Sequence, residues 1–374
     1  MTIFSSIHKP TLLIDEDKAR KNLALMNEKI IAQRKQFRPH FKTHQSAEIA
    51  EWFREIGIKK ITVSSIEMAG YFADHGWDDI FIAFPVNILQ IEEIIELSKR
   101  IHLSLLFEDI TTVGFIDQHI PCQISGWIKI DTGANRCGLK IGQFEKIAEL
   151  ANELEKSKNI TFKGLITHAG HSYRFKTVEE IRSVYDESVK TLLGIQVQLH
   201  QLGYSKIEIS VGDTPTSRLV NDFGNVDELR PGNFLFYDVQ QFQAGVCQLE
   251  EIAVTVVCPV VAVHPEQNEV VIYGGAIHLS KDSHTWGEVQ HAYGLASIPA
   301  QNGWGWDDKK IVGYLRSLSQ EHGVVVMPDG IPEEIKPGSL ICVFPAHSCL
   351  TVKAMQKYVN LDGETIHTML SNPL

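Results

Sequence analysis

Apolar and polar residues follow two different patterns along the chain, and the pattern changes near residue 245. From residue 37 to about 238, short β-rich runs alternate with stretches in which apolar residues recur every three or four positions. In the longest of these stretches, residues 177–202, one helical face would carry Ile181, Val184, Tyr185, Val189 and Leu192. This alternation predicts parallel strands joined by helices.

The first region contains eight predicted strands, at residues 37–42, 60–65, 80–85, 102–107, 124–131, 162–168, 206–212 and 228–237. The clearest predicted helices between them are residues 45–56, 88–99, 142–156 and 177–202. Eight such units predict an α/β fold, a TIM-type (β/α)8 barrel. An open doubly wound sheet is the alternative, because the number of strands does not establish closure.

Beyond residue 245 the segments are short and β-branched, at residues 252–263, 269–276, 310–318, 323–327, 339–344 and 351–359. Turn signals such as PEQN, PDG and LDG separate them, which predicts an antiparallel C-terminal β-domain. We therefore predict a barrel over residues 1–245 and a β-domain over residues 246–374. The strand-like TLLID, residues 11–15, precedes a predicted helix, so residues 1–16 are expected to pack with the β-domain.

Composition narrows the class of protein. Hydrophobic residues make up 44% of the chain, and the net charge is −11 without a long run of like charge, which argues against nucleic acid and anionic membranes as partners. No apolar stretch approaches the roughly 20 residues of a membrane helix, and the start lacks a basic segment before an apolar run. Six scattered cysteines without a C-x-x-C pair indicate free thiols. These features predict a soluble, cytoplasmic protein.

Barrel enzymes carry their chemistry at the carboxyl ends of the strands. The first predicted strand ends RPHFKTHQ, which places Lys42 at its tip between His40 and His44. A partly desolvated lysine near cationic groups loses its proton readily and can attack an aldehyde to form a Schiff base. A solvated lysine at a strand end is the alternative interpretation.

The fifth and sixth strands bring further polar groups to the same rim. KIDTGANRCGL delivers Asp131 and Arg136, and GLITHAGHSY delivers His168, His171 and Tyr173. An imidazole or phenol there could lie against a flat ring or donate a proton. Plain turn chemistry and a structural buried histidine are the alternatives.

The seventh and eighth strands indicate a phosphate site. In ISVGDTPTS, Gly212 permits close backbone approach, and Asp213 and Thr214 stand at a helix start whose hydroxyls could hold phosphate. An N-cap followed by proline explains the same string equally well. ELRPGNFLFYD adds Arg230 and Tyr237.

Together these strings resemble a known family. The order PTLLID, RPHFKTH, KIDTGANRCGL, GLITHAGHSY, GDTPTS, LRPGNFLFYD and PAHSC is similar to that of the fold-type III pyridoxal-phosphate enzymes, nearest to the D-serine dehydratase and D-threonine aldolase branch and more distant from alanine racemase. The resemblance covers nearly the whole chain, and RPHFKTH and PAHSC are its most specific parts.

The resemblance implies a role for each matching residue. Lys42 would carry pyridoxal phosphate as a Schiff base, with His168 and Arg136 beside the ring and its phenolic oxygen. Tyr173 would line the site, and Arg230 would face the pyridine nitrogen. The residues that would hold the phosphate are Gly212, Thr214 and Tyr237, around Asp213.

PAHSC is a candidate metal site. His347 and Cys349 are two apart in a predicted extended segment, where side chains at i and i+2 point the same way and could share a cation. A thiolate with an imidazole suits Zn²⁺, although two ligands alone are more typical of an ordinary buried cysteine near a histidine. The pair resembles zinc-dependent D-serine dehydratases, whereas D-threonine aldolases more often have an acidic residue there for Mn²⁺ or Mg²⁺.

The resemblance implies a lyase acting on D-configured β-hydroxy amino acids. It would be either a dehydratase, which converts D-serine to pyruvate and ammonia, or an aldolase, which cleaves the Cα–Cβ bond. In VIYGGAIHLSKD, Tyr273 and Ile277 depart from the family's charged pair while Asp282 is retained, which leaves substrate preference open. An amino-acid racemase and a non-catalytic pyridoxal-phosphate-binding protein are the alternatives. Relatives imply a homodimer.

Overall fold

The computed structural model describes residues 3–371, which form two compact units. The barrel unit comprises Leu25–Lys42 and Ala50–Gly232. The sheet unit comprises the described residues up to Ala24, Thr43–Ile49 and the chain from Asn233 onward. The sheet unit therefore includes residues 233–245, which the sequence predicted in the barrel. The domain boundary at residue 245 stays a prediction.

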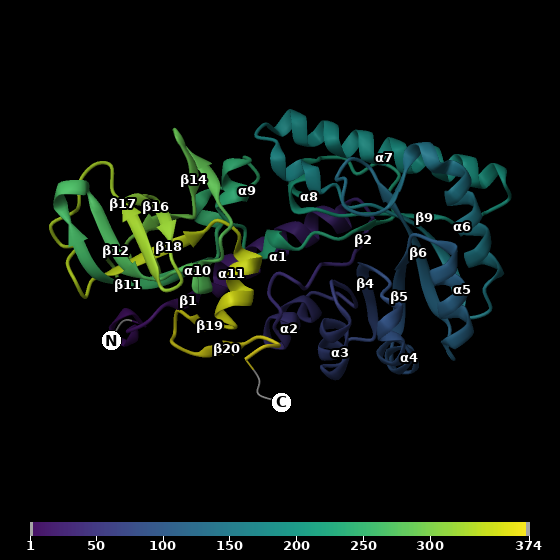
Figure 1. Cartoon of the computed structure of the whole chain (residues 1–374), viewed down its shortest axis with the longest axis horizontal. Coiled ribbons are helices and arrows are strands. Elements are labelled where there is room, and N and C mark those ends of the chain that lie inside the picture. Colours follow the sequence, from purple (N-terminus) through teal and green to yellow (C-terminus); the bar gives the residue numbers. More distant parts are fainter. Residues whose placement is uncertain (1–2, 372–374) are drawn as a thin grey trace. The chain divides into compact units, whose positions relative to one another are not determined.

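The barrel unit contains eight parallel strands in the order β2-β10-β9-β8-β6-β5-β4-β3 (Figure 1). A parallel bridge between His40 and Thr62 joins the β2 side to β3, so the outer strands of this order also meet. The predicted (β/α)8 barrel is confirmed, and the open doubly wound sheet is not what forms. The strands are β2 (Gln36–Phe37), β3 (Lys60–Val63), β4 (Asp79–Pro85), β5 (His102–Phe107), β6 (Ile124–Asp131), β8 (Ile160–Ile166), β9 (Glu208–Val211) and β10 (Glu228–Leu229), with the short β7 (Leu139–Lys140) beside β6.

Helices follow the strands as their apolar periodicity predicts. The longest, α7 (Val178–Gln201), begins at a capping box in which the side chains of Thr177 and Glu180 each bond the other's backbone N–H. The other helices after barrel strands are α2 (Ala47–Glu55), α3 (Ile66–Asp74), α4 (Ile91–Arg100), α5 (Ile110–His119), α6 (Phe144–Lys156) and α8 (Thr214–Leu219). Among residues 3–371, no helix has the length and apolar character needed to cross a membrane.

Large apolar side chains fill the middle of the barrel unit. Phe81, Leu106, Trp127 and Ile166 come from four successive strands and form one buried cluster. The rings of Phe81 and Trp127 stack with centroids 5.6 Å apart. This packed interior fixes the strand ends from which the candidate site residues project.

Two predicted barrel strands are wrong in length, and proline explains both. Pro39 and Pro231 lack an N–H that could join the ladder. β2 ends two residues before Pro39, and β10 ends two residues before Pro231. Lys42 therefore lies in a turn after β2 rather than on a strand. The rest of the segment predicted at 228–237 forms a turn and a 3-10 helix, and Tyr237 adopts a left-handed backbone conformation with φ of 50°.

The sheet unit contains a nine-stranded sheet in the order β12-β17-β16-β15-β18-β11-β1-β19-β20, and β12 also pairs with β11. β1 is antiparallel to β11 and parallel to β19, and the other pairs are antiparallel. The predicted antiparallel β-domain and the pairing of TLLI away from the barrel are confirmed. The strands are β1 (Thr11–Ile14), β11 (Val254–His264), β12 (Glu269–Tyr273), β15 (Gly294–Ser297), β16 (Gly313–Leu318), β17 (His322–Val326), β18 (Leu340–Pro345), β19 (Lys357–Asn360) and β20 (Thr365–His367), besides a hairpin of β13 (His284–Trp286) and β14 (Val289–Ala292).

The strand predicted at residues 351–359 is wrong. Its first half is the helix α11 (Ser348–Met355), and only its end belongs to β19. Thr351 and Val352 are β-branched, which suggested a strand, but both are buried in the helix, and Thr351 Oγ1 donates to the carbonyl of Leu279 at 3.2 Å. Tertiary packing thus outweighs their local preference.

Candidate active site

Basic side chains gather around Lys42 in the barrel unit. Burial holds the pKa of His40 well below its usual range, and the charges of Lys42, Arg230 and Arg136 lower it further. Burial is also the main cause of the low pKa of His168, and the charges of Lys42 and Arg136 lower it further. The chain as a whole has a net charge of −11. Because Lys42, Arg136 and Arg230 all act on His40, three cationic side chains lie near one histidine. A concentration of this kind suits a ligand that carries negative charge.

The histidines that flank Lys42 are not cationic. His40 is half-buried, its burial and the nearby positive charges hold its pKa low, and burial lowers the pKa of His44 to about 3. His40 Nδ1 accepts a hydrogen bond from the backbone N–H of Lys42 at 3.4 Å. The positive charge near Lys42 therefore comes from Arg136, which is exposed, and from Arg230, which is buried, and not from its sequence neighbours.

His168 and Tyr173 meet the predicted phosphate turn. His168 Nδ1 donates to the carbonyl oxygen of Gly212, which leaves Nε2 with its lone pair. The rings of His168 and Tyr173 have centroids 6.4 Å apart, and Tyr173 Oη accepts from the backbone N–H of Thr214 at 3.4 Å. The structure thus brings together four of the predicted cofactor residues in the barrel unit.

Asp213 is the N-cap of α8. Its carboxylate accepts from the N–H and hydroxyl of Thr216, both at 2.8 Å, and from the hydroxyl of Ser172 at 3.0 Å. Burial raises the pKa of Asp213 to about 6, although these hydrogen bonds oppose the shift. The N-cap interpretation of GDTPTS is therefore observed, and Asp213 shapes the turn by these bonds.

Gly212 makes room for its neighbour strand. A Cβ atom at Gly212 would lie 2.8 Å from the Cβ of Arg230 and 2.9 Å from its carbonyl oxygen. A glycine is therefore required here because Arg230 lies so close to its backbone. This explanation does not need the close approach to phosphate that the sequence predicted.

Lys129 was not predicted as a site residue. It lies within β6 and is only 5% exposed, and burial together with Arg230 and Arg136 lowers its pKa to about 7. The signal was present in the sequence, since WIKID places one charged residue in the middle of an apolar strand. A buried amine that is half neutral at pH 7 is a second potential nucleophile in the barrel.

The candidate metal pair lies in the sheet unit, with a local geometry that differs from the prediction. His347 is the N-cap of α11 and Cys349 is in its first turn, so the extended segment is wrong. The two side chains nevertheless converge. His347 Nδ1 lies 2.8 Å from Asp282 Oδ2, and hydrogen bonds to Asp282 and Cys349 outweigh burial and raise the pKa of His347 to about 11.

Polar groups that the sequence did not reveal surround the Cys349 sulfur. The hydroxyl of Thr43 lies 3.4 Å from Sγ, and Asn233 Nδ2 donates to Sγ at 3.6 Å. Asn233 also donates to Asp238 Oδ2 at 2.7 Å, and Asp238 in turn accepts from the N–H of Ser348 at 3.1 Å. Tyr237, predicted at the phosphate, belongs to this unit, and its N–H donates to the carbonyl of Asn233 at 2.7 Å.

The donor set fits a metal ion with open positions. Within residues 3–371 no group of three or more His, Cys, Asp or Glu side chains is arranged to hold a metal. His347 and Cys349 can supply two ligands, and Asp282 fixes the imidazole through Nδ1, as carboxylates do for metal-binding histidines. A cation held by this pair would therefore retain positions for water or substrate.

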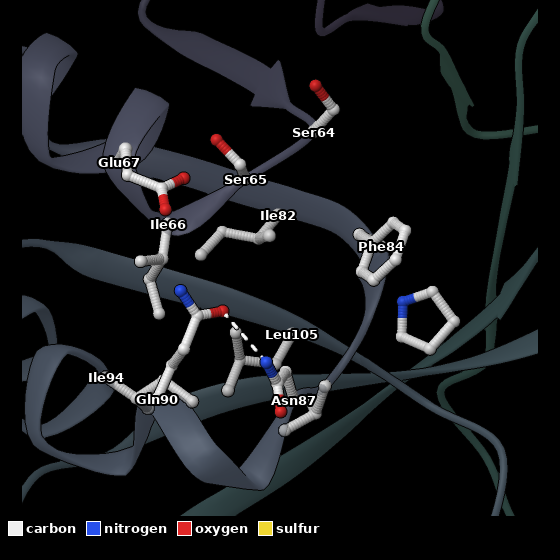
Figure 2. A pocket seen from close by; sticks show the side chains of 12 residues that line it. Ser64, Ser65, Ile66, Glu67, Ile82, Phe84, Asn87, Gln90, Ile94 and Leu105 are labelled. Carbon is white, nitrogen blue, oxygen red and sulfur yellow. Dashed lines mark hydrogen bonds between the residues drawn. The ribbon is translucent and has the colours of Figure 1, made fainter.

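A cavity of about 200 Å³ lies elsewhere in the barrel unit, after β3 and β4 (Figure 2). Figure 2 shows Ser64 and Ser65 at the top of the view, Phe84 at the right, and Asn87 and Gln90 below. Asn87 Nδ2 donates to Gln90 Oε1 at 3.4 Å. None of the residues predicted for cofactor or metal lines this cavity.

Comparisons with known proteins match both the barrel region and the C-terminal region of the chain. The family "alanine racemase, N-terminal domain" matches residues 14–239, and "putative serine dehydratase domain" matches residues 253–361. D-serine dehydratase of Dictyostelium discoideum is 28% identical over 98% of this chain and 97% of that protein.

D-threo-3-hydroxyaspartate dehydratase of Delftia sp. HT23 is 26% identical over 96% of this chain and 95% of that protein. Its solved structure has a TM-score of 0.88 and covers 98% of this chain and 99% of that chain, at 25% identity. Another structure of that dehydratase, a cysteine-to-alanine mutant in the metal-free form, has a TM-score of 0.89 at 24% identity and covers 99% of each chain.

Proposed function

This chain belongs to the alanine racemase N-terminal domain family of fold-type III pyridoxal-phosphate enzymes and continues into a serine dehydratase domain, and from that premise we propose that it is a lyase acting on D-configured β-hydroxy amino acids. D-serine, converted to pyruvate and ammonia, is the first proposed substrate. A D-3-hydroxyaspartate is the second, and D-threonine cleavage is the aldolase alternative.

The barrel unit would hold the cofactor. Lys42 would bind its aldehyde carbon, and the cationic groups of Arg136 and Arg230 would balance its negative charges. His168, kept neutral and fixed through Nδ1, would lie against the ring. The backbone of Gly212–Thr214 and the hydroxyl of Tyr237 would bind the phosphate. When bound, pyridoxal phosphate supplies an electron sink for negative charge at the substrate α-carbon.

The single observation that favours a lyase is the His347–Cys349 pair with Asp282 behind it. A racemase needs a proton acceptor on each face of the cofactor and has no use for a metal. We propose Zn²⁺ as the ion, because a thiolate favours zinc over Mn²⁺ and Mg²⁺. A bound cation would act as a Lewis acid on the substrate's β-hydroxyl. Lys42 Nζ, released when the substrate's amino group takes its place on the cofactor, would accept the α-proton.

The proposal extends to the enzyme's setting. We propose that it works in the cytoplasm as a homodimer, by analogy with the family. Its partner is a small amino acid, and nucleic acid and membranes are not partners.

The test is a substrate panel with a chelator. D-serine, D-threo-3-hydroxyaspartate, D-threonine and their L-forms are assayed for keto acid, aldehyde and racemised product. We expect keto acid from a D-substrate, lost on treatment with EDTA while the visible cofactor absorbance persists, and zinc near one per chain. Cys349→Ala should lose both metal and lyase activity. Full activity in metal-free protein would overturn the lyase proposal and favour a racemase.

A further inference from the structure

We propose that Ser210 and Glu228 are positioning residues that orient the Arg230 guanidinium toward the cofactor ring. The inference rests on the proposed function, because it concerns a side chain assigned to the cofactor. Neither Ser210 nor Glu228 would touch the cofactor, and both act through Arg230.

The guanidinium of Arg230 is held at two of its three nitrogens. Nε donates to the hydroxyl oxygen of Ser210 at 2.7 Å, and Nη2 donates to the carbonyl of Thr167 at 2.6 Å. Among residues 3–371, Nη1 has no hydrogen-bond partner, although Arg230 is only 5% exposed. This nitrogen is therefore the one that remains available to donate to a ligand.

Ser210 has its own proton committed elsewhere. Its hydroxyl donates to Glu228 Oε1 at 2.7 Å, so the lone pairs of Ser210 are what Arg230 meets. A hydroxyl has one proton, and this arrangement fixes its direction. Because Glu228 accepts the single hydroxyl proton, Ser210 can meet Arg230 Nε only as an acceptor.

Glu228 is fixed in turn by a second arginine. Arg38 Nε donates to Glu228 Oε2 at 2.7 Å, and Arg38 Nη1 donates to Asp79 Oδ1 at 2.6 Å. The Glu228 side chain is only 1% exposed. Arg38 thus links the two carboxylates, and Ser210 connects this group to Arg230, so two arginines and two carboxylates share one network.

The strand register produces this chain of contacts. Ser210 on β9 and Glu228 on β10 are direct partners in the parallel ladder, so their side chains are neighbours. Arg230 follows Glu228 by two residues, and side chains two apart along an extended backbone lie on the same face. Gly212, also two residues beyond Ser210, leaves the space that the Arg230 backbone occupies.

A purely structural role is the competing explanation, and it predicts different measurements. If the contacts only stabilise the barrel, removing the Ser210 hydroxyl lowers the melting temperature and changes nothing at the cofactor. If they orient Arg230, the same change alters the electronic environment of the pyridine nitrogen. Arg230 Cζ also lies 6.0 Å from the Phe81 ring centroid, a weaker contact that Ser210→Ala leaves in place.

The experiment compares Ser210→Ala with a matched control, Ser125→Ala. Ser125 is a buried serine of the same barrel, and its hydroxyl contacts His102 Nε2 at 3.2 Å, a residue outside the proposed site. Each protein is stripped of cofactor and titrated with pyridoxal phosphate, and the visible absorption maximum and dissociation constant are measured beside the melting temperature. We expect Ser210→Ala to shift the absorption maximum and to weaken cofactor binding about tenfold, the effect of one hydrogen bond to a charged group.

Two further variants complete the test. Ser210→Thr keeps the hydroxyl and should have the wild-type absorption maximum. Glu228→Gln should shift the absorption maximum as Ser210→Ala does. If Ser210→Ala does not fold, Glu228→Gln takes its place in the test. Spectra and affinities equal to those of Ser125→Ala would overturn the inference while the cofactor assignment stands. Wild-type protein that binds no pyridoxal phosphate would instead overturn the proposed function.

Discussion

The Nδ1 atom of His347 lies 2.8 Å from the Oδ2 atom of Asp282. This contact determines which ring nitrogen is available to a metal, because Nδ1 carries its proton toward the carboxylate and Nε2 is left to ligate. It also makes the imidazole a better donor, since a negative group behind a histidine raises its basicity. Asp282 comes from a segment far from PAHSC in the sequence, and only the fold joins the two.

We expect Asp282→Asn to weaken zinc binding by roughly tenfold or more, the usual effect of losing a carboxylate behind a metal-bound histidine. The measurement is competition with a coloured chelator. Asp308→Asn is the control, because Asp308 is also in the sheet unit and is ion-paired with Lys18 at 2.6 Å. Equal zinc affinity in the two variants would contradict this role of Asp282.

Borohydride reduction of the holoenzyme should fix the cofactor on Lys42. We expect peptide mapping to find the label on the peptide that contains Lys42, and Lys42→Ala to lose the visible absorbance and nearly all turnover. Lys129 is the internal competitor, because its amine is half neutral near pH 7. A label on Lys129 would sink the assignment of Lys42.

Lys129 should also make the stability of the apoprotein depend on pH. Its folded pKa is about 7 and its ordinary value is 10.5, so the folded state binds fewer protons between these values. Burying the charge therefore costs stability in full below pH 7, and the cost fades as pH rises to 10.5. We expect Lys129→Met to gain on the order of 4 kcal/mol relative to wild type below pH 7, and nothing above pH 10.5, in urea unfolding. A gain that does not change with pH would rule this out.

Gly212→Ala is expected to destabilise the barrel by about 1–3 kcal/mol, because the new methyl group would overlap Arg230. Gly194→Ala is the matched control. Gly194 lies in α7, and a Cβ there would meet no atom within 4 Å. That change should stabilise the protein by up to about 1 kcal/mol through helix propensity. Thermal unfolding of both apoproteins gives the comparison, and a stable Gly212→Ala would refute the steric explanation.

The sequence predicted the barrel well because strand and helix periods differ clearly there. The 124–131 strand and the 177–202 helix agree with β6 and α7 to within a residue. The prediction failed where tertiary contacts decide the backbone, as in α11, whose β-branched residues are buried by α10 (Ala276–Leu279) and its surroundings.

The candidate site was predictable only in part. Motif strings identify residues at strand ends, such as His168 and Gly212, which the structure joins by a hydrogen bond. They do not identify residues that act from within strands. In the sequence Ser210 lies between two apolar residues and Glu228 lies in the charged run DELR, and only the ladder register brings them together.

The placement of β1 has a consequence for biosynthesis. β1 is translated well before its neighbours β11 and β19, which begin at Val254 and Lys357. At about 5–20 residues per second, TLLI emerges from the ribosome tens of seconds before β19 exists. Until β11 is made, this apolar strand lacks both of its partners, and the barrel strands can pair before it does.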